Sequence, residues 1–469
     1  MKRLLAAIAA AIGIATGAFA EVIDLSDPAV AIDVLTLTDG DIATGTLNWS
    51  TENPCMVTIL DGATVTLRNV TIYGRDYANC KWAGITCEGD ATIILEGVNF
   101  VRGFYREYPG IQVYENQTLT IQGSGSLEAT GSFYGTVTGS GAGIGGGGSR
   151  GLGVMNHCGN IVIKSGTITA TGHGGAAGIG SGGQQTRCGN IIIEGGDVTA
   201  TAQESEGAAG IGSGKGGSCG TVTIGPGIAR VVAICDSDCD NPVGAGKDGS
   251  CGTVTVANTL DDKTSGNTRT IKARRVDLDE VVSETMLLDG TTVFGTLNGS
   301  SQPYKISIAD GATVTVSNAV VNGAHSSSCK WAGLTCEGDA TIIVAYGINS
   351  FRGFNEDYPG IFVPPGKTLT IKGESRLDAF SNGYGAGIGG GYTFNGSVVD
   401  CGNIVIEGGI IHAYGGEYAA GIGGGYKSSC GSIEIKGGDV TADGESLPRQ
   451  SAAATATLPA ATSPSPAAR

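Results

Sequence analysis

Two stretches of the chain carry acidic residues at matching positions. Glu88 and Asp90 in one stretch are repeated as Glu337 and Asp339 in the other. Paired carboxylates can act as the acid and base of a glycosidase, or hold Ca²⁺ for a lyase in which an Arg is the base. None of the four histidines has the same position in both stretches, and GxSxG, HExxH and Gly-Lys-Ser/Thr motifs are missing. Acidic residues at such positions are also typical of solvated turns, so we expect no catalytic residue, no metal site and no other cofactor.

Aromatic residues gather in the same two stretches. Residues 73–114 hold eight of the Phe, Trp and Tyr residues, and residues 331–362 hold six. Exposed rings can stack on sugar rings, and a neighbouring Arg can hydrogen-bond sugar hydroxyls. The sequence predicts a carbohydrate-binding set of Trp82, Arg102, Tyr108, Trp331, Arg352 and Tyr358. The alternative is that these rings fill or cap a core. For Trp82 and Trp331, each in an apolar Cys-Lys-Trp-Ala-Gly segment, burial and exposure are equally expected.

The thirteen cysteines form a third candidate set. Cys158, Cys188, Cys219 and Cys251 follow one another at steps of 30, 31 and 32 residues. Cysteines stacked on successive coils of a β-solenoid lie about 4.8 Å apart, within the Cα separation of a disulfide. In an exported chain we therefore expect bridges. The predicted pairs are Cys80–Cys87, Cys158–Cys188, Cys219–Cys251, Cys329–Cys336 and Cys401–Cys430, with Cys235–Cys239 as a further candidate. A ladder of reduced, buried thiols is the alternative.

Residues 1–20 have the features of a secretory signal peptide. Lys2 and Arg3 precede a short apolar run, and residues 18–20 read Ala-Phe-Ala, which fits cleavage before Glu21. An uncleaved anchor is the alternative. Loss of two of the 28 basic residues leaves 26 against 44 acidic ones, a net charge of −18. Such a chain repels nucleic acid, and no later stretch has the roughly 18 apolar residues of a membrane-spanning helix. We expect a secreted or cell-surface protein without membrane insertion, with the periplasm as the alternative compartment.

The chain contains two copies of one unit. Residues 61–72 read DGATVTLRNVTI and residues 310–321 read DGATVTVSNAVV, and CKWAGITCEGDATII at Cys80 recurs as CKWAGLTCEGDATII at Cys329. The expected organisation is copy one at 21–258, a linker at 259–275, copy two at 276–443, and a tail at 444–469. The tail is rich in Ala, Thr, Ser and Pro, so we expect disorder. A flexible stalk and a truncated end both remain open for it.

A period of about 30 residues recurs inside each copy. Alternating runs such as residues 161–163 predict strands, and Gly pairs predict corners. The 82 glycines disfavour helices. We therefore predict an all-β fold, two tandem right-handed parallel β-helices, with Ile161, Ile163 and Ile168 pointing inward. Ala-Gly-Ile-Gly segments are expected to form a tightly bent face. An antiparallel β-sandwich is the alternative.

The repeats CGNIVIEGG, AAGIGGG and CKWAGITCEGDATI resemble those of secreted bacterial glycine-rich β-helix surface proteins. The resemblance covers residues 45–258 and 295–443. It implies a secreted or cell-surface solenoid that binds an extracellular glycan or another cell-surface component, or acts as an adhesin, without catalysis. The wider β-helix group includes polysaccharide lyases, so a polysaccharide lyase or glycoside hydrolase is one alternative. A purely structural spacer is the other. Ligand, anchoring and oligomeric state stay open, and no catalytic residue is carried over by the resemblance.

Overall fold

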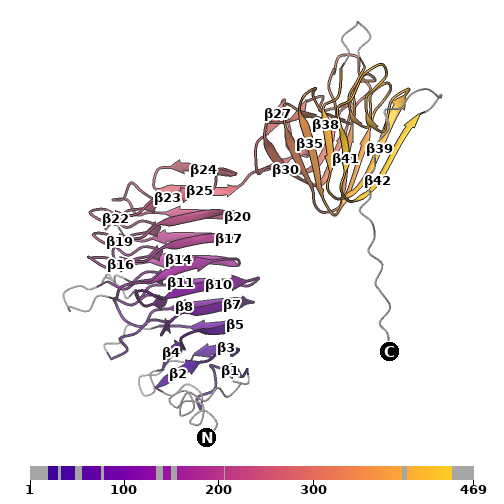
Figure 1. Ribbon diagram of the computed structural model, residues 1–469. Helices are drawn as coiled ribbons and strands as arrows, with labels where there is room; N and C mark the ends of the chain where they lie inside the picture. The colour runs from indigo at the N-terminus through magenta and orange to yellow at the C-terminus, as the bar shows by residue number, and fades with distance from the viewer. Residues whose placement is uncertain are drawn as a thin grey trace, which may run out of the picture. The chain divides into compact units, whose positions relative to one another are not determined.

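The chain folds into two compact units, Met1–Ala273 and Arg274–Arg469 (Figure 1). The computed structural model describes residues 20–29, 33–47, 55–74, 79–133, 141–148, 156–204, 206–392 and 399–445. The predicted signal peptide and tail lie almost wholly outside these residues. In the described part, no helix is long and apolar enough to cross a membrane.

The first unit is a parallel β-helix built on three sheets (Figure 1). The fourteen-stranded sheet contains β1 (Val22–Asp24), β3 (Ile42–Leu47), β5 (Ala63–Ile72), β7 (Ala91–Glu96), β8 (Val98–Arg102), β10 (Thr118–Gly123), β11 (Ser126–Thr130), β13 (Asn160–Ile163), β14 (Thr167–Gly172), β17 (Ile191–Ala202), β20 (Val222–Ile234), β23 (Val254–Val256), β24 (Leu260–Ser265) and β25 (Thr268–Ala273). The eight-stranded sheet contains β2 (Val34–Leu37), β4 (Met56–Ile59), β6 (Ile85–Cys87), β9 (Ile111–Val113), β12 (Ile144–Gly145), β15 (Ile179–Gly180), β18 (Ile211–Gly212) and β21 (Val243–Gly244). The three-stranded sheet contains β16 (Arg187–Cys188), β19 (Ser218–Cys219) and β22 (Ser250–Cys251).

Aliphatic ladders fill the interior of the first unit. One ladder runs through the eight-stranded sheet, where parallel pairing stacks Ile111, Ile144, Ile179, Ile211 and Val243. Ile161, Ile163 and Ile168 are fully buried, which confirms their predicted inward direction. Burial of such a side chain stabilises the folded state by about 1.5–3 kcal/mol relative to leaving it exposed. The parallel pairing between successive coils confirms the predicted β-helix and excludes the antiparallel sandwich.

Glycine allows the Ala-Gly-Ile-Gly segments to bend tightly. In β15 the backbone of Gly180 has a φ of +138°, and a Cβ there would lie 1.9 Å from the carbonyl oxygen of Gly212 in the next coil. Ala177 N–H donates to the Ser181 carbonyl at 3.1 Å and closes the bend. Any side chain larger than hydrogen at Gly180 would therefore separate the two coils. The large side chain within the bend is that of Ile179, which is fully buried.

Most of the segment predicted as a linker, residues 259–275, forms a β-hairpin. Strands β24 and β25 pair antiparallel with each other, and β25 pairs antiparallel with β20. The side chains of β24 after Leu260 are exposed, and they include Asp261, Asp262 and Lys263. A charged outer strand prevents further edge pairing. The polar composition that indicated a linker therefore belongs to an edge hairpin of the first unit.

The second unit repeats the parallel β-helix with two sheets and one short 3₁₀ helix, η1 (Leu278–Glu280). The eleven-stranded sheet contains β26 (Arg275–Asp277), β28 (Thr292–Asn298), β30 (Ala312–Asn322), β32 (Ala340–Val344), β33 (Ile348–Arg352), β35 (Thr368–Gly373), β36 (Arg376–Phe380), β38 (Asn403–Ile406), β39 (Ile410–Glu417), β41 (Ile433–Ile435) and β42 (Asp439–Glu445). The six-stranded sheet contains β27 (Thr285–Leu287), β29 (Ile306–Ile308), β31 (Leu334–Cys336), β34 (Ile361–Phe362), β37 (Ile388–Gly389) and β40 (Ile422–Gly423).

Candidate functional site

Both predicted tryptophans cover buried phenylalanines. The ring centroids of Trp82 and Phe104 are 5.8 Å apart, and those of Trp331 and Phe354 are 5.7 Å apart. Phe104 and Phe354 are fully buried, whereas each tryptophan is partly buried. The same contact in both units makes these tryptophans part of the core packing, with only part of each ring at the surface.

The two predicted tyrosines lie in turns and are also partly buried. Burial raises the pKa of Tyr108, and a hydrogen bond to Asn156 acts in the opposite direction. Burial raises the pKa of Tyr358 as well, and the neighbouring carboxylate of Asp357 adds to this effect. Among the described residues, no ring contact joins either tyrosine to the tryptophan of its own unit. The backbone segments that carry the set are nevertheless adjacent, because Phe104 N–H donates to the Trp82 carbonyl at 3.2 Å and Phe354 N–H donates to the Trp331 carbonyl at 3.2 Å. The predicted carbohydrate-binding set stays a prediction.

Arg102 of the first unit is bound by its own chain. Its guanidinium donates a hydrogen bond to the carbonyl oxygen of Phe133. The Phe133 ring stacks on His173 at 4.9 Å with 25° between the planes. Nδ1 of His173 lies 3.2 Å from Glu204 Oε1, and burial lowers the pKa of this histidine while Glu204 raises it. The interactions of Arg102 thus support the end of strand β8.

Arg352 of the second unit lies beside a row of aromatic rings. Its guanidinium carbon is 4.7 Å from the ring centroid of Phe380. Phe380 in turn stacks on Tyr414, with centroids 4.8 Å apart and only 3° between the planes. Parallel register sets this row, because Arg352, Phe380 and Tyr414 are directly paired on β33, β36 and β39. We call Arg352, Phe380 and Tyr414 the aromatic stack.

Strand alternation turns the aromatic stack outward. The preceding residues Phe351, Ala379 and Ala413 are buried in the core, so the next residue on each strand faces solvent. Arg352, Phe380 and Tyr414 are each partly exposed. Two residues earlier on the same strands are Asp378 and His412, whose carboxylate and ring nitrogen are 3.5 Å apart. The stack therefore combines flat rings with polar groups along one side.

A second aromatic group surrounds the tight bends of the second unit. It consists of Tyr384, Tyr392, Tyr418 and Tyr426, which we call the tyrosine cluster. The ring of Tyr426 lies 5.9 Å from Tyr384, 5.0 Å from Tyr392 and 5.3 Å from Tyr418. The rings of Tyr384 and Tyr392 are 5.9 Å apart at 72°. Tyr418 is the most open of the four, with 47% of its surface exposed.

Two matching segments account for this cluster. Residues 384–392 read YGAGIGGGY and residues 418–426 read YAAGIGGGY. Each tyrosine lies four residues from the central isoleucine, and Ile388 pairs with Ile422 in the sheet. The first unit has SGAGIGGGG, GAAGIGSGG and GAAGIGSGK at its corresponding bends. The sequence prediction missed these tyrosines because it considered only aromatic residues common to both copies.

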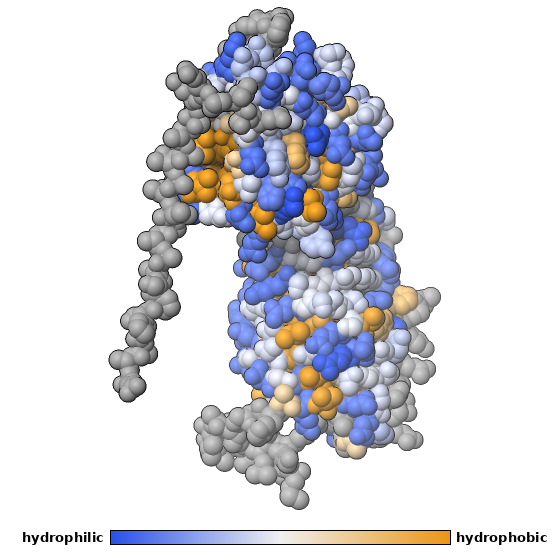
Figure 2. Space-filling model, turned by 90° about the vertical axis from the view of Figure 1, so that its right-hand side faces the viewer, coloured by the Kyte–Doolittle hydropathy of each residue, from blue (hydrophilic) through white to orange (hydrophobic). Residues whose placement is uncertain are grey.

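Exposed apolar side chains elsewhere are scattered. Figure 2 shows one face on which hydrophobic residues form small patches among hydrophilic ones. Large exposed examples such as Val98 at 72% and Tyr346 at 76% come from separate strands or turns. This pattern is typical of an ordinary protein surface.

The carboxylates considered for catalysis connect successive coils. Asp90 accepts a hydrogen bond from Thr118 N–H at 2.7 Å, and Asp339 accepts one from Thr368 N–H at 2.7 Å. The backbone N–H groups of Asp90 and Asp339 in turn donate to the side chains of Asp61 and Asp310, one coil earlier. Within the described ranges, no group of three or more His, Cys, Asp or Glu residues could hold a metal ion. The contacts of Asp90 and Asp339 are thus those of structural corner residues.

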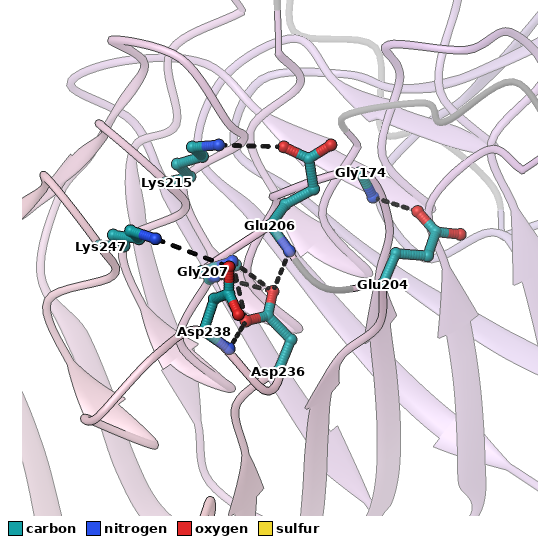
Figure 3. A network of polar contacts seen from close by, with 9 residues as sticks. Gly174, Glu204, Glu206, Gly207, Lys215, Asp236, Asp238 and Lys247 are labelled. Atoms are coloured by element: carbon teal, nitrogen blue, oxygen red, sulfur yellow. Dashed lines mark hydrogen bonds and ion pairs between the residues drawn. The ribbon is translucent and has the colours of Figure 1, made fainter.

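Corner carboxylates of the same kind hold the end of the first unit (Figure 3). Asp236 is 6% exposed and accepts hydrogen bonds from the backbone N–H groups of residues 206–208 at 3.1, 2.7 and 3.0 Å. It also accepts one from Asp238 N–H at 3.2 Å. One coil earlier, Glu204 accepts from Gly174 N–H at 2.7 Å. These carboxylates accept the hydrogen bonds of backbone N–H groups that would otherwise have no partner where the chain turns.

The cysteines stack in the predicted order. The Sγ atoms of Cys158 and Cys188 are 2.9 Å apart, and those of Cys219 and Cys251 are 2.6 Å apart. Cys401 and Cys430 form a parallel backbone bridge in the second unit. All thirteen cysteines are thiols in this structure, so the bridges stay a prediction. The predicted local partners, Cys80 with Cys87 and Cys329 with Cys336, are all buried. Burial raises the pKa of Cys87 and of Cys336 to about 12.

Comparison with known families identifies beta helix repeats in both units. The family model for this repeat matches residues 161–183, 191–215, 369–392 and 404–426. The last two matches include the bends that carry the tyrosine cluster. Comparisons with curated proteins and with solved structures gave no match.

Proposed function

We propose that the protein is a secreted or cell-surface β-solenoid that binds extracellular carbohydrate, in the manner of an adhesin and without catalysis. The observation that carries this proposal is the aromatic stack of the second unit. Phe380 and Tyr414 have stacked, nearly parallel rings whose centroids are 4.8 Å apart. The C–H face of a pyranose ring can lie against such rings, because aromatic faces carry partial negative charge.

Polar groups next to the stack complete the support for sugar recognition. Arg352 Nη1 donates to Asn382 Oδ1 at 3.2 Å, and Asn382 Nδ2 donates to the Gly353 carbonyl at 2.6 Å. These bonds fix the guanidinium over Phe380 and leave its other N–H groups for ligand oxygens. Asp378 and His412 lie two residues earlier on the same strands, β36 and β39. A few fixed polar groups beside apolar faces are typical of small-molecule and sugar sites.

The fold supports a rigid binding surface. Strands β36 and β39, which carry the two rings of the stack, are each paired with a neighbouring strand on both sides within the eleven-stranded sheet. The ligand therefore meets side chains whose positions are set by the β-ladder, which lowers the entropy cost of binding. The predicted export signal agrees with action outside the cytoplasm. The acidic composition of the chain favours a glycan that is not itself strongly anionic.

A glycan array tests this proposal, combined with reducing-end and unsaturated-product assays on the same mature protein. We expect binding without product formation. Phe380→Ala with Tyr414→Ala is expected to abolish most of the signal, while Tyr346→Ala removes an exposed tyrosine of the same unit outside the stack and leaves binding unchanged. Product formation would favour a polysaccharide lyase or glycoside hydrolase. If neither binding nor product is detected, the carbohydrate-binding proposal fails and the purely structural spacer is favoured.

A further inference from the structure

The tyrosine cluster is a preformed group of four rings outside the aromatic stack. Its two bends are closed by matching hydrogen bonds, from Ala386 N–H to the Gly390 carbonyl at 2.9 Å and from Ala420 N–H to the Gly424 carbonyl at 3.1 Å. The bends contain only Gly, Ala and Ile between the tyrosines, so the tyrosine rings are the only aromatic side chains in these two segments. Pairing of the two coils then brings the four rings together.

Backbone hydrogen bonds place the cluster next to an acidic turn. Tyr384 N–H donates to the Glu356 carbonyl at 2.5 Å, and Tyr392 N–H donates to the Asp357 carbonyl at 2.7 Å. Glu417 immediately precedes Tyr418. Glu417, followed by burial and Glu356, raises the pKa of Tyr384, with smaller contributions from Tyr418 and Asp357. The ring of Tyr384 therefore lies in the negative potential of three carboxylates.

One ammonium group already occupies a face of the cluster. Nζ of Lys427 lies 5.0 Å from the ring centroid of Tyr426. This distance is within the range of a cation–π interaction. Lys330 lies near Asp357 and offsets part of the acidic charge there. Lys427 itself is exposed, so its ammonium can leave the ring when a ligand cation takes its place.

From this geometry we infer that the tyrosine cluster is a subsite for glycans that carry free amino groups. The aromatic faces and carboxylates favour an ammonium on a sugar ring, whereas a neutral or anionic sugar lacks this interaction. The inference rests on the proposed carbohydrate binding and adds its selectivity. The tight bends of the first unit carry no tyrosine, so selectivity for amino sugars belongs to the second unit.

Calorimetric titration with two matched oligosaccharides tests this inference. The probes are a hexasaccharide of glucosamine and the same hexasaccharide fully N-acetylated, at about pH 6, where an amine is charged. We expect the wild-type protein to bind the amino form about tenfold more tightly, the size of effect that one cation–π contact can give. Equal affinity for the two probes would overturn the inference and leave carbohydrate binding intact. If neither probe binds and the glycan array is also blank, the proposed function itself fails.

Three variants separate the subsite from the rest of the protein. Tyr418→Ala and, separately, the isosteric Glu417→Gln are expected to lose most of the preference while affinity for the N-acetylated probe is retained. Lys427→Gln removes the competing ammonium and is expected to increase affinity for the amino form severalfold. Tyr346→Ala is the matched control and leaves the preference unchanged. The assignment would be contradicted if the preference for the amino probe survived both Tyr418→Ala and Glu417→Gln and if Lys427→Gln left the affinity for this probe unchanged.

Discussion

Replacing Asp236 with Ala tests how corner carboxylates hold the coils of the first unit. The carboxylate is buried and accepts hydrogen bonds from the N–H groups of residues 206–208 and of Asp238 (Figure 3). The N–H groups of Gly207 and Ala208 are on buried residues of the preceding coil. An alanine methyl cannot accept these bonds, so at least two buried donors lose their partner.

The size of the effect follows from these contacts. A buried donor without a partner costs about 1–3 kcal/mol, and a hydrogen bond to a charged acceptor is worth about 1.5–3 kcal/mol. Such contributions are not additive within one network. We expect the free energy of unfolding to fall by about 3 kcal/mol. With a urea m-value of about 2 kcal/mol/M, the unfolding midpoint of the first unit would fall by about 1.5 M.

Urea unfolding with amide hydrogen exchange measures this change. Exchange is expected to accelerate at residues 206–208, because solenoid coils interact mainly with their neighbours. Asp238→Ala is the matched control, since Asp238 is exposed and its carboxylate lies 3.5 Å from Lys247 Nζ. An exposed ion pair contributes about 0–1 kcal/mol. If Asp236→Ala were no more destabilising than Asp238→Ala, the proposed role of the corner carboxylates would be wrong.

Three further predictions concern the thiols, one histidine and the core. Thiol titration of the denatured, unreduced protein is expected to find one to three free thiols if the predicted bridges form, and about thirteen would refute them. Burial lowers the pKa of His173 below its ordinary value of 6.5; the unfolded state then binds the proton better, so stability is complete above about pH 6.5 and decreases as pH falls. His173→Gln is expected to flatten this dependence in urea unfolding between about pH 5 and 7, and an unchanged slope would assign it to other groups. Ile179→Ala removes a fully buried ladder residue and is expected to cost about 2–5 kcal/mol in the same measurement; a loss below about 1 kcal/mol would contradict the ladder.

The repeat pattern predicted the fold because the same physical demand recurs on every coil. Ile161, Ile163 and Ile168 alternate with outward residues, and the structure buries all three. The glycines of the tight bends were likewise recognisable, since a side chain at Gly180 would meet the next coil. The hairpin at β24 and β25 was not, because its outer strand has no apolar alternation. Edge pairing with β20 depends on tertiary contacts that a local pattern does not contain.

The candidate site was predicted less well, because burial depends on partners distant in sequence. Strands β6, β7 and β8 lie between Trp82 and Phe104 in the sequence, and only the fold reveals the contact of their rings. Arg102 and Arg352 match in sequence, yet one donates to a backbone carbonyl and the other lies over Phe380. The neighbouring positions differ between the copies, and the search for shared residues excluded them. A search for residues unique to one copy would have found the repeated tyrosines of the second unit.

The central claim is that the aromatic stack binds carbohydrate. The most direct measurement is calorimetric titration of the mature protein, and of its Phe380→Ala, Tyr414→Ala double variant, with the glycan that gives the strongest array signal. Truncation of central aromatic residues costs about 2 kcal/mol or more, which corresponds to at least a roughly 30-fold weaker Kd. We predict this loss in a double variant that still unfolds in one cooperative thermal transition, at a somewhat lower midpoint because the stacked ring pair is lost. An unchanged Kd in the folded double variant would contradict it.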